Sequence, residues 1–533
     1  MRIFLALVAL GLAAPAVARE PVDASAPEKL SVTVYRNPER GEGDSMNRDW
    51  PQGFAMISEV RTVTLPQGRS TIRFTGVAEG MVAVSAIVTG LPGGTIEKNR
   101  NADLLSPAAL VDGTLGNRVT VTRTDPATGK TRSEEAVVRT RADGGLVLQT
   151  LQGFEAVRCS GLPEKLTFDR IPSGLSHEPV FTIDTQSQAA GTYTVTLTYL
   201  AWGFDWEANY VARLREGKGD GGVKVDLLSW LTILNDNGQS FENAELMAVA
   251  GTLSIESNFE DLADPPVARP LGLTCYPFGS TAAGSPYSTY PAPPPPPPPP
   301  PAAVAAYDAS ELITVTGARL KRAALESAAP LAVIAGEEAL GDLKLYRVPE
   351  PVTVSAQGQK QVAFLDRKSV DASFVYGVEC ILGPIHDPYP ARLQLTALNE
   401  KKKGLGQSLP MGGITIYEPT EFGDLLVAQT RMRDYALSQE VELDLPESTQ
   451  VFTACGAPGE FDEDRKWHAM RGVVTNANDA PIVMRFKLGW ASEIEVRGLK
   501  GTRIKDGFRI YEVTVPANSR KTYDFRMRDV RSE

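Results

Sequence analysis

Strict alternation of apolar and polar residues recurs along almost the whole chain and predicts β-strands. Early examples are LSVTVY at 30–35 and ISEVRTVTL at 57–65, and a later one is TYTVTLTYLAW, which begins at Thr192. Such alternation places one face of a strand on a core and the other in water. Turn signals such as Pro66-Gln67-Gly68 separate the runs. Strands at short intervals between turns are typical of β-sandwiches or barrels rather than βαβ units.

Nine consecutive prolines, Pro293 to Pro301, interrupt this pattern. β-type sequence occupies residues 225–251 before them and 340–366 after them. Proline has a fixed φ and no N–H, so the tract cannot join a hydrogen-bonded ladder. The tract predicts either a plain spacer, about 28 Å long as polyproline II, or a ligand for a groove-binding partner.

These signals predict an all-β protein of several β-sandwich domains joined by a flexible Pro-rich insertion. Helical signal is scarce: residues 323–328 are the best candidate, and 336–340 could add one turn. The predicted organisation is an N-terminal β domain at 29–160, a central β-sandwich formed by 161–262 together with 342–370, a Pro-rich linker at 263–341 and a C-terminal β-sandwich at 371–533.

The first 18 residues have the pattern of a secretory signal peptide. Arg2 precedes the apolar run IFLALVALGLAA, and Ala16-Val17-Ala18 predicts cleavage between Ala18 and Arg19. The run is shorter than the ~20 residues that a membrane span needs, and no other segment approaches that length. We therefore expect an exported protein without a transmembrane span, in the periplasm or at the envelope of a Gram-negative bacterium.

Hydrophobic content and net charge limit the kinds of molecule that this protein is expected to bind. Of the 533 residues 42% are hydrophobic, which is enough for several packed cores. The net charge of −11 argues against nucleic acid or an anionic membrane as partner, because both attract clustered Lys and Arg. The one basic run, Lys401-Lys402-Lys403, is typical of a solvated turn. The oligomeric state stays open.

The cysteines are too far apart for the CxxC spacing of metal sites. Four well-separated cysteines in an oxidising compartment favour two disulfides, for which three connectivities exist. We favour one bridge on each side of the prolines, with free buried thiols as the alternative. The favoured pairs are Cys159–Cys275 and Cys380–Cys455.

Candidate catalytic chemistry is sparse. The three histidines, His177, His386 and His468, form no i, i+3 or i, i+4 pair, and there is no HExxH motif, nucleophile elbow or P-loop. The acidic run 462–464, followed by Trp467 and His468, suits a Ca²⁺-binding loop or simply a solvated loop. We therefore assign no catalytic residue, metal site or cofactor.

Four longer segments carry a family resemblance. They are YLAWGFDWEANYVARL at 199–214, WLTILNDNGQSFENAELMAVAG at 230–251, LKLYRVPEPVTVSAQGQKQVAFL at 343–365 and LGQSLPMGGITIYE at 405–418. Together they resemble a bacterial family of exported β proteins related to mucoidy inhibitor A, whose large C-terminal domain has no assigned function. The resemblance implies a β scaffold and brings no catalytic residues. Members of that family often have a long helical hairpin after the N-terminal domain. This chain has β sequence there, so we do not assign the family's binding partners to it.

A second, local resemblance lies within residues 311–340. Val315, Thr316, Gly317 and Arg319 are similar to the opening of the plug region in TonB-dependent receptors. The barrel of such a receptor has no counterpart in the sequence, so a transporter is excluded. An exposed segment of this kind could add a strand to the sheet edge of an envelope or periplasmic protein; a plain linker loop is the alternative.

These features favour a non-catalytic, envelope-associated module that acts through protein contacts, with residues 311–340 as the predicted contact. The alternative is a carbohydrate-active or other hydrolase whose carboxylates meet only in the fold. Such an enzyme would need two carboxyl groups about 5–9.5 Å apart in a cleft with an aromatic floor.

Overall fold

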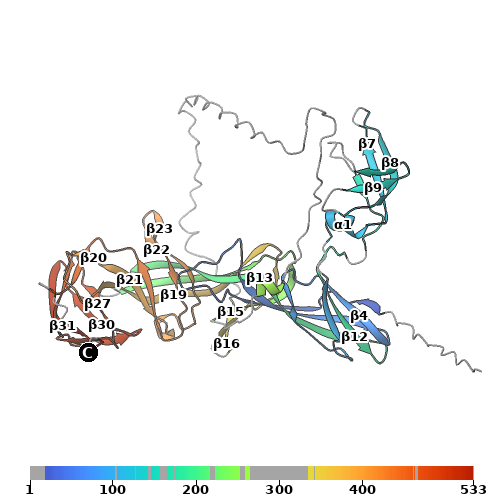
Figure 1. The fold of residues 1–533 in the computed structure, drawn as a ribbon. Coiled ribbons are helices and arrows are strands. Elements are labelled where there is room, and N and C mark those ends of the chain that lie inside the picture. The colour runs from blue at the N-terminus through green and yellow to red at the C-terminus, as the bar shows by residue number, and fades with distance from the viewer. Residues whose placement is uncertain are drawn as a thin grey trace, which may run out of the picture. The chain divides into compact units, whose positions relative to one another are not determined.

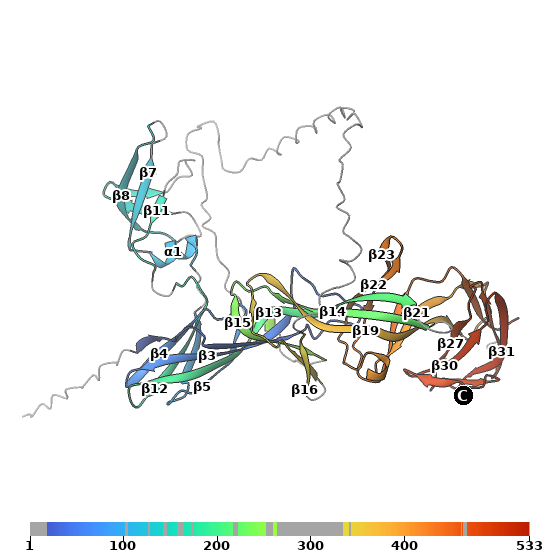
Figure 2. The same cartoon turned by 180° about the vertical axis from the view of Figure 1, so that it is seen from behind.

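The computed structural model of the protein is built almost entirely of strands (Figures 1 and 2). The prediction of an all-β, multi-domain fold is therefore confirmed. The described residues form two compact units, one drawn from the described residues within 19–100, 180–263 and 334–531 and the other from those within 101–179. The structure describes residues 19–101, 105–125, 128–141, 146–156, 165–172, 175–216, 222–251, 259–263, 334–340, 343–459, 461 and 466–531.

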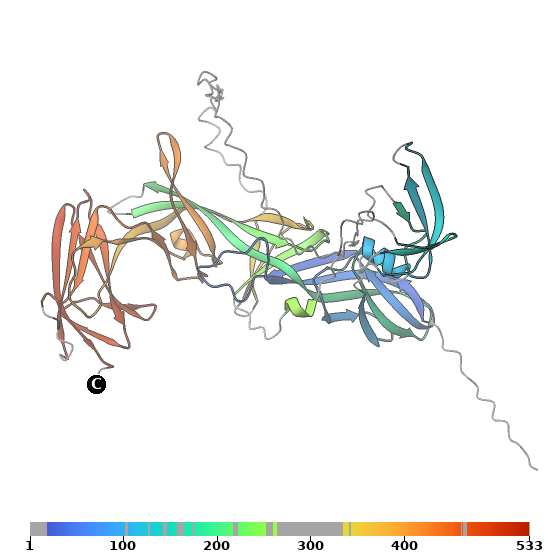
Figure 3. The ribbon, with the colours of Figure 1, turned by 45° about the horizontal axis from the view of Figure 1, so that its top comes forward.

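Two long strands, β13 (Gly191–Glu216) and β19 (Gly358–Glu379), organise the first unit. The first half of β13 pairs antiparallel with β3 (Gly53–Leu65), and its second half pairs antiparallel with β14 (Gly222–Asn235). β14 in turn pairs antiparallel with β19. Strands from the N-terminal region and from both sides of the proline tract therefore belong to one hydrogen-bonded network (Figure 3).

β13 changes partner at a β-bulge. Its register against β3 shifts between Trp202 and Phe204, and Gly203 has a φ of +85°, which glycine adopts without steric cost. Beyond the bulge, Phe204 and Trp206 are fully buried. The indole N–H of Trp206 donates to the carbonyl oxygen of Val249 at 3.1 Å. The sequence WGFDW thus supplies both the bulge of the strand and two of the largest fully buried side chains of the core.

Shorter strands complete this network. They are β2 (Lys29–Tyr35), β5 (Met81–Thr89), β15 (Phe241–Ala250), β16 (Gly336–Leu340), β17 (Leu343–Arg347), β18 (Val352–Val354), β21 (Arg392–Leu398), β22 (Gly412–Thr420), β23 (Gly423–Met432), β24 (Glu440–Leu445), β27 (Ile482–Trp490), β29 (Arg503–Lys505) and β30 (Phe508–Val515). The short helix α2 (Phe259–Ala263) and an exposed 3₁₀ turn at Lys401–Lys403 also belong to this unit.

A second sheet of this unit packs against the network. Its strand order is β1-β4-β12-β6, and its strands are β1 (Glu20–Asp23), β4 (Gly68–Thr75), β12 (Val180–Ser187) and β6 (Glu97–Asn101). Phe74 and Phe181 from this sheet lie 6.3 Å apart between ring centroids and share one core with residues of β3 and β13. Burial of these apolar faces is the main source of stability for the packing of the two sheets.

The C-terminal strands form a β-sandwich with its own core. One sheet has the order β20-β25-β26-β31-β28, with β20 (Tyr389–Pro390), β25 (Val451–Gly456), β26 (His468–Asn476), β31 (Ser519–Asp529) and β28 (Ile494–Arg497). It packs on β27 and β30 around Phe486 and Phe525. The predicted disulfide between Cys380 and Cys455 is present, with Cα atoms 5.1 Å apart, and joins the end of β19 to β25.

The second unit is a small sheet inserted between β6 and β12. Its antiparallel order is β10-β9-β8-β7-β11, with β10 (Gly153–Ala156), β9 (Val147–Thr150), β8 (Thr131–Val138), β7 (Arg118–Thr124) and β11 (Lys165–Thr167). The short helix α1 (Pro107–Gly113) begins at Ser106, whose hydroxyl accepts the N–H of Ala109. Val111 on α1 packs in a core with Val121 and Leu148.

The predicted domain boundaries do not coincide with the limits of the two compact units. β2 to β5 lie in the first unit and β7 to β10 in the second, although all fall within the predicted domain 29–160. The boundary predicted at residue 370 lies inside β19. The helical turn that the sequence favours at 336–340 is wrong: these residues form β16, because they pair antiparallel with β17. Within the described ranges no helix has the length and apolar character needed to cross a membrane.

Candidate functional site

Two strands of the first unit carry charged residues between buried apolar ones. In β24, the sequence EVEL alternates two buried apolar residues with Glu440 and Glu442. In β27, the sequence MRF places Arg485 between two apolar residues of the C-terminal core. Side chains alternate across a strand, so the charged residues point away from the two cores and meet each other.

Arg485 is the centre of the resulting ion-pair network. Its side chain is 8% exposed, and its guanidinium contacts Glu512 on β30 at 2.6 Å, Glu440 at 3.2 Å and also Glu442. The Lys505 ammonium on β29 contacts Glu440 at 3.2 Å and Glu442 at 3.0 Å. The network therefore joins β24, which contributes to the first core, to three strands of the C-terminal region.

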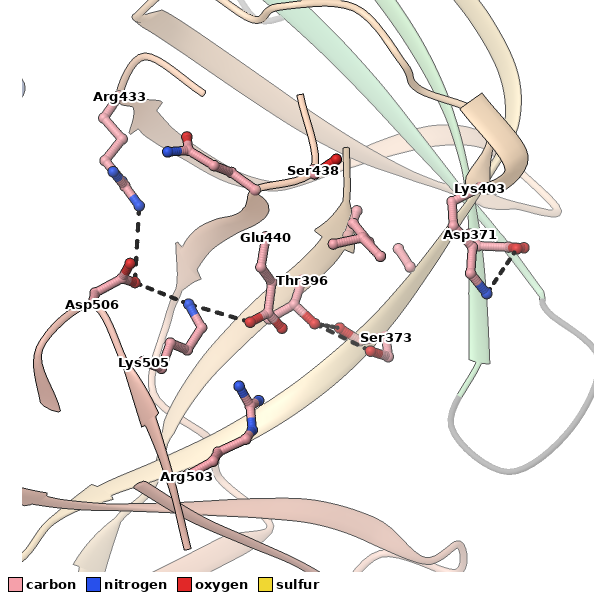
Figure 4. A pocket seen from close by; sticks show the side chains of 14 residues that line it. Asp371, Ser373, Thr396, Lys403, Arg433, Ser438, Glu440, Arg503, Lys505 and Asp506 are labelled. Carbon is pink, nitrogen blue, oxygen red and sulfur yellow. Dashed lines mark hydrogen bonds and ion pairs between the residues drawn. The ribbon is translucent and has the colours of Figure 1, made fainter. Parts of the chain in front are cut away.

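A cavity of about 710 Å³ opens beside this network, and Figure 4 shows its polar lining. Lys505 lies between Glu440 and Asp506, and Arg433 reaches the same Asp506 at 3.9 Å (Figure 4). The labelled lining residues are Asp371, Ser373, Thr396, Lys403, Arg433, Ser438, Glu440, Arg503, Lys505 and Asp506. The cavity is polar and charged of both signs, so it suits a polar ligand better than an apolar one.

A smaller cavity of about 240 Å³ shares Lys505 and Asp506 with the first. Here the Lys487 ammonium binds Glu379 at 2.8 Å and lies 3.8 Å from the ring centroid of Phe508. Phe508 in turn packs on Trp490 with ring centroids 3.9 Å apart. Phe508 therefore borders this cavity, with Lys487 in a cation–π contact and Trp490 packed behind its ring.

The carboxylates of both cavities are engaged by cations. Among the described residues, each acidic side chain that lines either cavity has a Lys or Arg partner within 4 Å. A hydrogen bond from Lys224 holds the pKa of Asp371 below its ordinary value, and one from Lys487 does the same for the pKa of Glu379. A general acid needs a raised pKa at neutral pH. Asp371 and Glu379 are therefore unsuited to that role.

A second charged cluster is deeply buried and centred on Asp205. The Oδ1 atom of Asp205 accepts hydrogen bonds from the Arg40 guanidinium at 2.6 Å, from the Trp206 N–H at 2.8 Å and from the Asn37 N–H at 3.1 Å. Burial raises the pKa of Asp205 from 3.8 to about 6, although Arg40 and the two backbone donors favour the ionised form. The carboxylate and Arg40 are each only 3% exposed, so this cluster anchors the segment after β2 rather than meeting a ligand.

This cluster predicts a distinct dependence of stability on pH. Because the folded pKa of Asp205 is raised, its contribution to stability is fully present below its unfolded pKa near 3.8 and is lost as pH rises through about 6. Relative to an Asp205→Asn variant, the natural chain should therefore gain on the order of 2–3 kcal/mol between pH 7 and pH 4. Urea unfolding of both chains across this range measures the difference. A difference that stays constant with pH would contradict the assignment.

Only some of the site residues predicted from the sequence lie in the part of the chain that the structure describes. Besides Cys380 and Cys455, Arg19 is described, and its guanidinium lies 3.6 Å from Glu97 and also contacts Asp184. His468 is buried and stacks on Phe461 at 4.6 Å between ring centroids. The predicted residues that lie outside the described ranges are Ala18, Cys159, Cys275, Val315, Thr316, Gly317, Arg319 and the acidic run 462–464.

The charge network was not found by sequence reasoning, although its residues leave a signal. Acidic residues alternate with apolar ones in QEVELDLP at 439–446, and Arg485 and Lys487 alternate with apolar residues in β27. This pattern predicts that each strand has a charged face. It does not say that the two charged faces meet, because that depends on pairings between distant strands such as β19 with β21 and β27.

Comparisons with known proteins assign no identity to these features. No protein-family model matches the chain, and no curated protein matches it.

Proposed function

We propose that this protein is exported and acts without catalysis, in the periplasm or at the bacterial envelope, through contacts with other proteins. The observation that carries the proposal is the pairing of acidic groups around the cavities. Glu440 and Asp506 line the cavity of about 710 Å³ beside the network, and both are bound by Lys505. Carboxylates committed to internal ion pairs brace strands, whereas a hydrolase needs at least one that is free to exchange a proton.

Two sequence features support the same proposal. The four segments that resemble the exported family related to mucoidy inhibitor A are rich in strand residues and carry no nucleophile or metal-ligand motif. The segment around Val315, Thr316, Gly317 and Arg319 is similar to a receptor plug opening, and an extended segment of that kind can pair with the free edge of a partner sheet. We propose this segment as one contact.

A pull-down from an envelope extract of the source organism tests the proposal. We expect the full chain to retain a defined protein partner, and a chain that lacks residues 311–333 to lose it. That deletion ends before β16 and leaves its pairing with β17 in place. Replacement of Pro293 to Pro301 by a Gly-Ser stretch of equal length is the matched control, because it changes the same region but not the proposed contact.

Two outcomes would contradict the proposal. Equal recovery of the partner by the deleted chain would remove the segment as a contact. Hydrolysis of an envelope polysaccharide by the purified full chain, abolished by Glu440→Gln, would replace the proposal with the hydrolase alternative.

A further inference from the structure

The hairpin of β22 and β23 ends in an exposed apolar tip. The side chains concerned are Phe422, which is 94% exposed, Leu425 at 54% and Leu426 at 58%. Figures 1 and 3 show the hairpin standing out from the rest of its sheet. Single exposed apolar residues are common on protein surfaces, whereas three within five positions at a protruding turn indicate a contact site.

The turn itself is firmly built. Thr420 and Gly423 close a two-residue loop: the Thr420 hydroxyl donates to the Gly423 carbonyl at 2.8 Å and accepts the N–H of Phe422 at 3.2 Å. Gly423 has a φ of +120°, which favours glycine. These bonds hold the backbone of Phe422 at the apex of the loop, so little backbone conformational entropy would be lost when its ring is buried by a partner.

The hairpin extends beyond the strand that supports it. β13 pairs with β22 only from Gly412 to Tyr417, and the Arg213 guanidinium braces the start of the overhang through Asp424 at 2.7 Å. Leu425 and Leu426 are consecutive, so they point to opposite faces of the ribbon. Both are more than half exposed, and therefore neither face of the tip is covered by the body of the protein.

The charges around the tip specify its partner. Residues 418–427 contain no Lys or Arg. Of their three acidic residues, Asp424 is paired with Arg213, and Glu418 and Glu421 form the acidic rim of the tip. An anionic bilayer would repel this acidic rim. A protein pocket that is apolar at its base and rimmed by Lys or Arg would bury the apolar tip and pair with the acids.

We propose that the β22–β23 hairpin inserts its apolar tip, with Phe422 as the anchor, into an apolar pocket with a basic rim on a partner protein. This inference rests on the proposed function and specifies the surface that carries it. The partner contact proposed within residues 311–340 is separate, since those residues are not part of the hairpin.

Site-specific photocrosslinking locates the contact. The full chain carries a benzophenone amino acid at position 422, 151, 87 or 490, one position at a time, and is irradiated with an envelope extract of the source organism. All four positions are exposed apolar or aromatic residues. We expect a protein cross-link at 422, and we expect the cross-linked partner peptide to contain or adjoin apolar and Lys or Arg residues.

The partner identified in this way is then purified and its affinity measured. Phe422→Ser should weaken binding about tenfold or more, as expected for a truncated anchor. Glu418→Lys combined with Glu421→Lys should weaken it mainly at low salt, because rim charges act through screened attraction.

Leu151→Ser is the matched control. Leu151 is a fully exposed apolar residue at the β9–β10 turn, where Thr150 and Gly153 make the same hydroxyl contacts. Residues 148–156 have a single acidic residue, Glu155, which is paired with Arg123, so the control should bind as the natural chain does.

The outcomes separate this inference from the proposed function. A protein cross-link at 87 or 490 with none at 422 would overturn the hairpin but keep a protein-contact function. No protein cross-link at any position would count against both. A blue shift of a Phe422→Trp reporter on vesicles of phosphatidylethanolamine and phosphatidylglycerol, without a protein cross-link at 422, would assign the tip to a membrane surface instead. A cross-link at 422 between two copies of this chain would make the tip a self-association site and overturn the inference.

Discussion

Replacement of Arg485 by methionine is expected to lower the free energy of unfolding of the C-terminal region by about 3 kcal/mol. Methionine keeps much of the aliphatic volume and removes the charge. The three carboxylates that Arg485 contacts would then face each other across the space between β24, β27 and β30. Loss of one member of a buried ion-pair network leaves charges without compensation, and that is the dominant cost.

The expected loss of unfolding free energy depends on which ion pairs remain after Arg485 is replaced. Removal of one partner of a buried pair typically costs about 3–5 kcal/mol. Here Glu440 and Glu442 keep Lys505, and Glu512 keeps Arg503 at 2.9 Å. The carboxylate side chains are also 20–27% exposed, so water compensates part of the loss. We therefore expect the lower end of the range.

Hydrogen exchange measured by mass spectrometry checks this prediction strand by strand. Peptides from β24, β27 and β30 should exchange faster in Arg485→Met, and peptides from β4 and β12 should not change. Arg471→Met is the matched control, since the ion pair between Arg471 and Asp524 has a similar distance of 2.7 Å but both side chains are largely exposed. An exposed pair contributes about 0–1 kcal/mol. Equal effects of the two substitutions would mean that the Arg485 network stabilises nothing beyond an ordinary surface pair.

The strands of this protein could be predicted from sequence because each carries its own signal. The alternation in TYTVTLTYLAW appears in the structure as the first half of β13, and the turn at Pro66-Gln67-Gly68 separates β3 from β4. Alternation reports which face of a strand is buried. It carries no information about which distant strand becomes the neighbour.

The pairing of strands could not be predicted for that reason. β3 and β13 pair in one register from Leu65 with Gly191 to Phe54 with Trp202, although a complete second unit lies between them in sequence. The strands of that unit have the same alternation as those of the first. Nothing local marks residue 101 as the point where one core ends and another begins.

The helical turn expected at 336–340 is wrong for a related reason, because propensity is local and strand pairing is not. GEEAL contains good helix formers, yet this segment lies beside β17 and gains ladder hydrogen bonds there. Tertiary pairing outweighs a propensity difference of a few tenths of a kcal/mol per residue. The charge network was missed in the same way, because Arg485 and Glu442 are 43 positions apart and meet only after their strands have been placed.

Removal of the disulfide between Cys380 and Cys455 is expected to cost the C-terminal sandwich about 4 kcal/mol. The bridge closes a loop with a sequence separation of 75 residues, and the chain-entropy relation for a loop of that length gives about 4 kcal/mol. The loop contains β20 to β24 and most of β25. Without the bridge, the unfolded state regains the freedom of that whole segment.

The double variant Cys380→Ala with Cys455→Ala tests this directly. Thermal unfolding should begin at lower temperature, and exchange should rise first in β25 and β26, next to the lost bridge. Strands β1 to β5 should keep their protection, since they belong to a different core. An unfolding profile identical to that of the natural chain would contradict the entropic assignment.

Reduction of the natural chain extends the same experiment to the second predicted bridge. If Cys380–Cys455 is the only disulfide, a reducing agent should destabilise the natural chain as much as the double alanine substitution does and should not affect the variant. If Cys159 and Cys275 are also paired, as predicted, reduction should cost the natural chain more than the double substitution does. The variant itself would then still respond to the reducing agent, because a bridge outside the C-terminal sandwich remains to be cut.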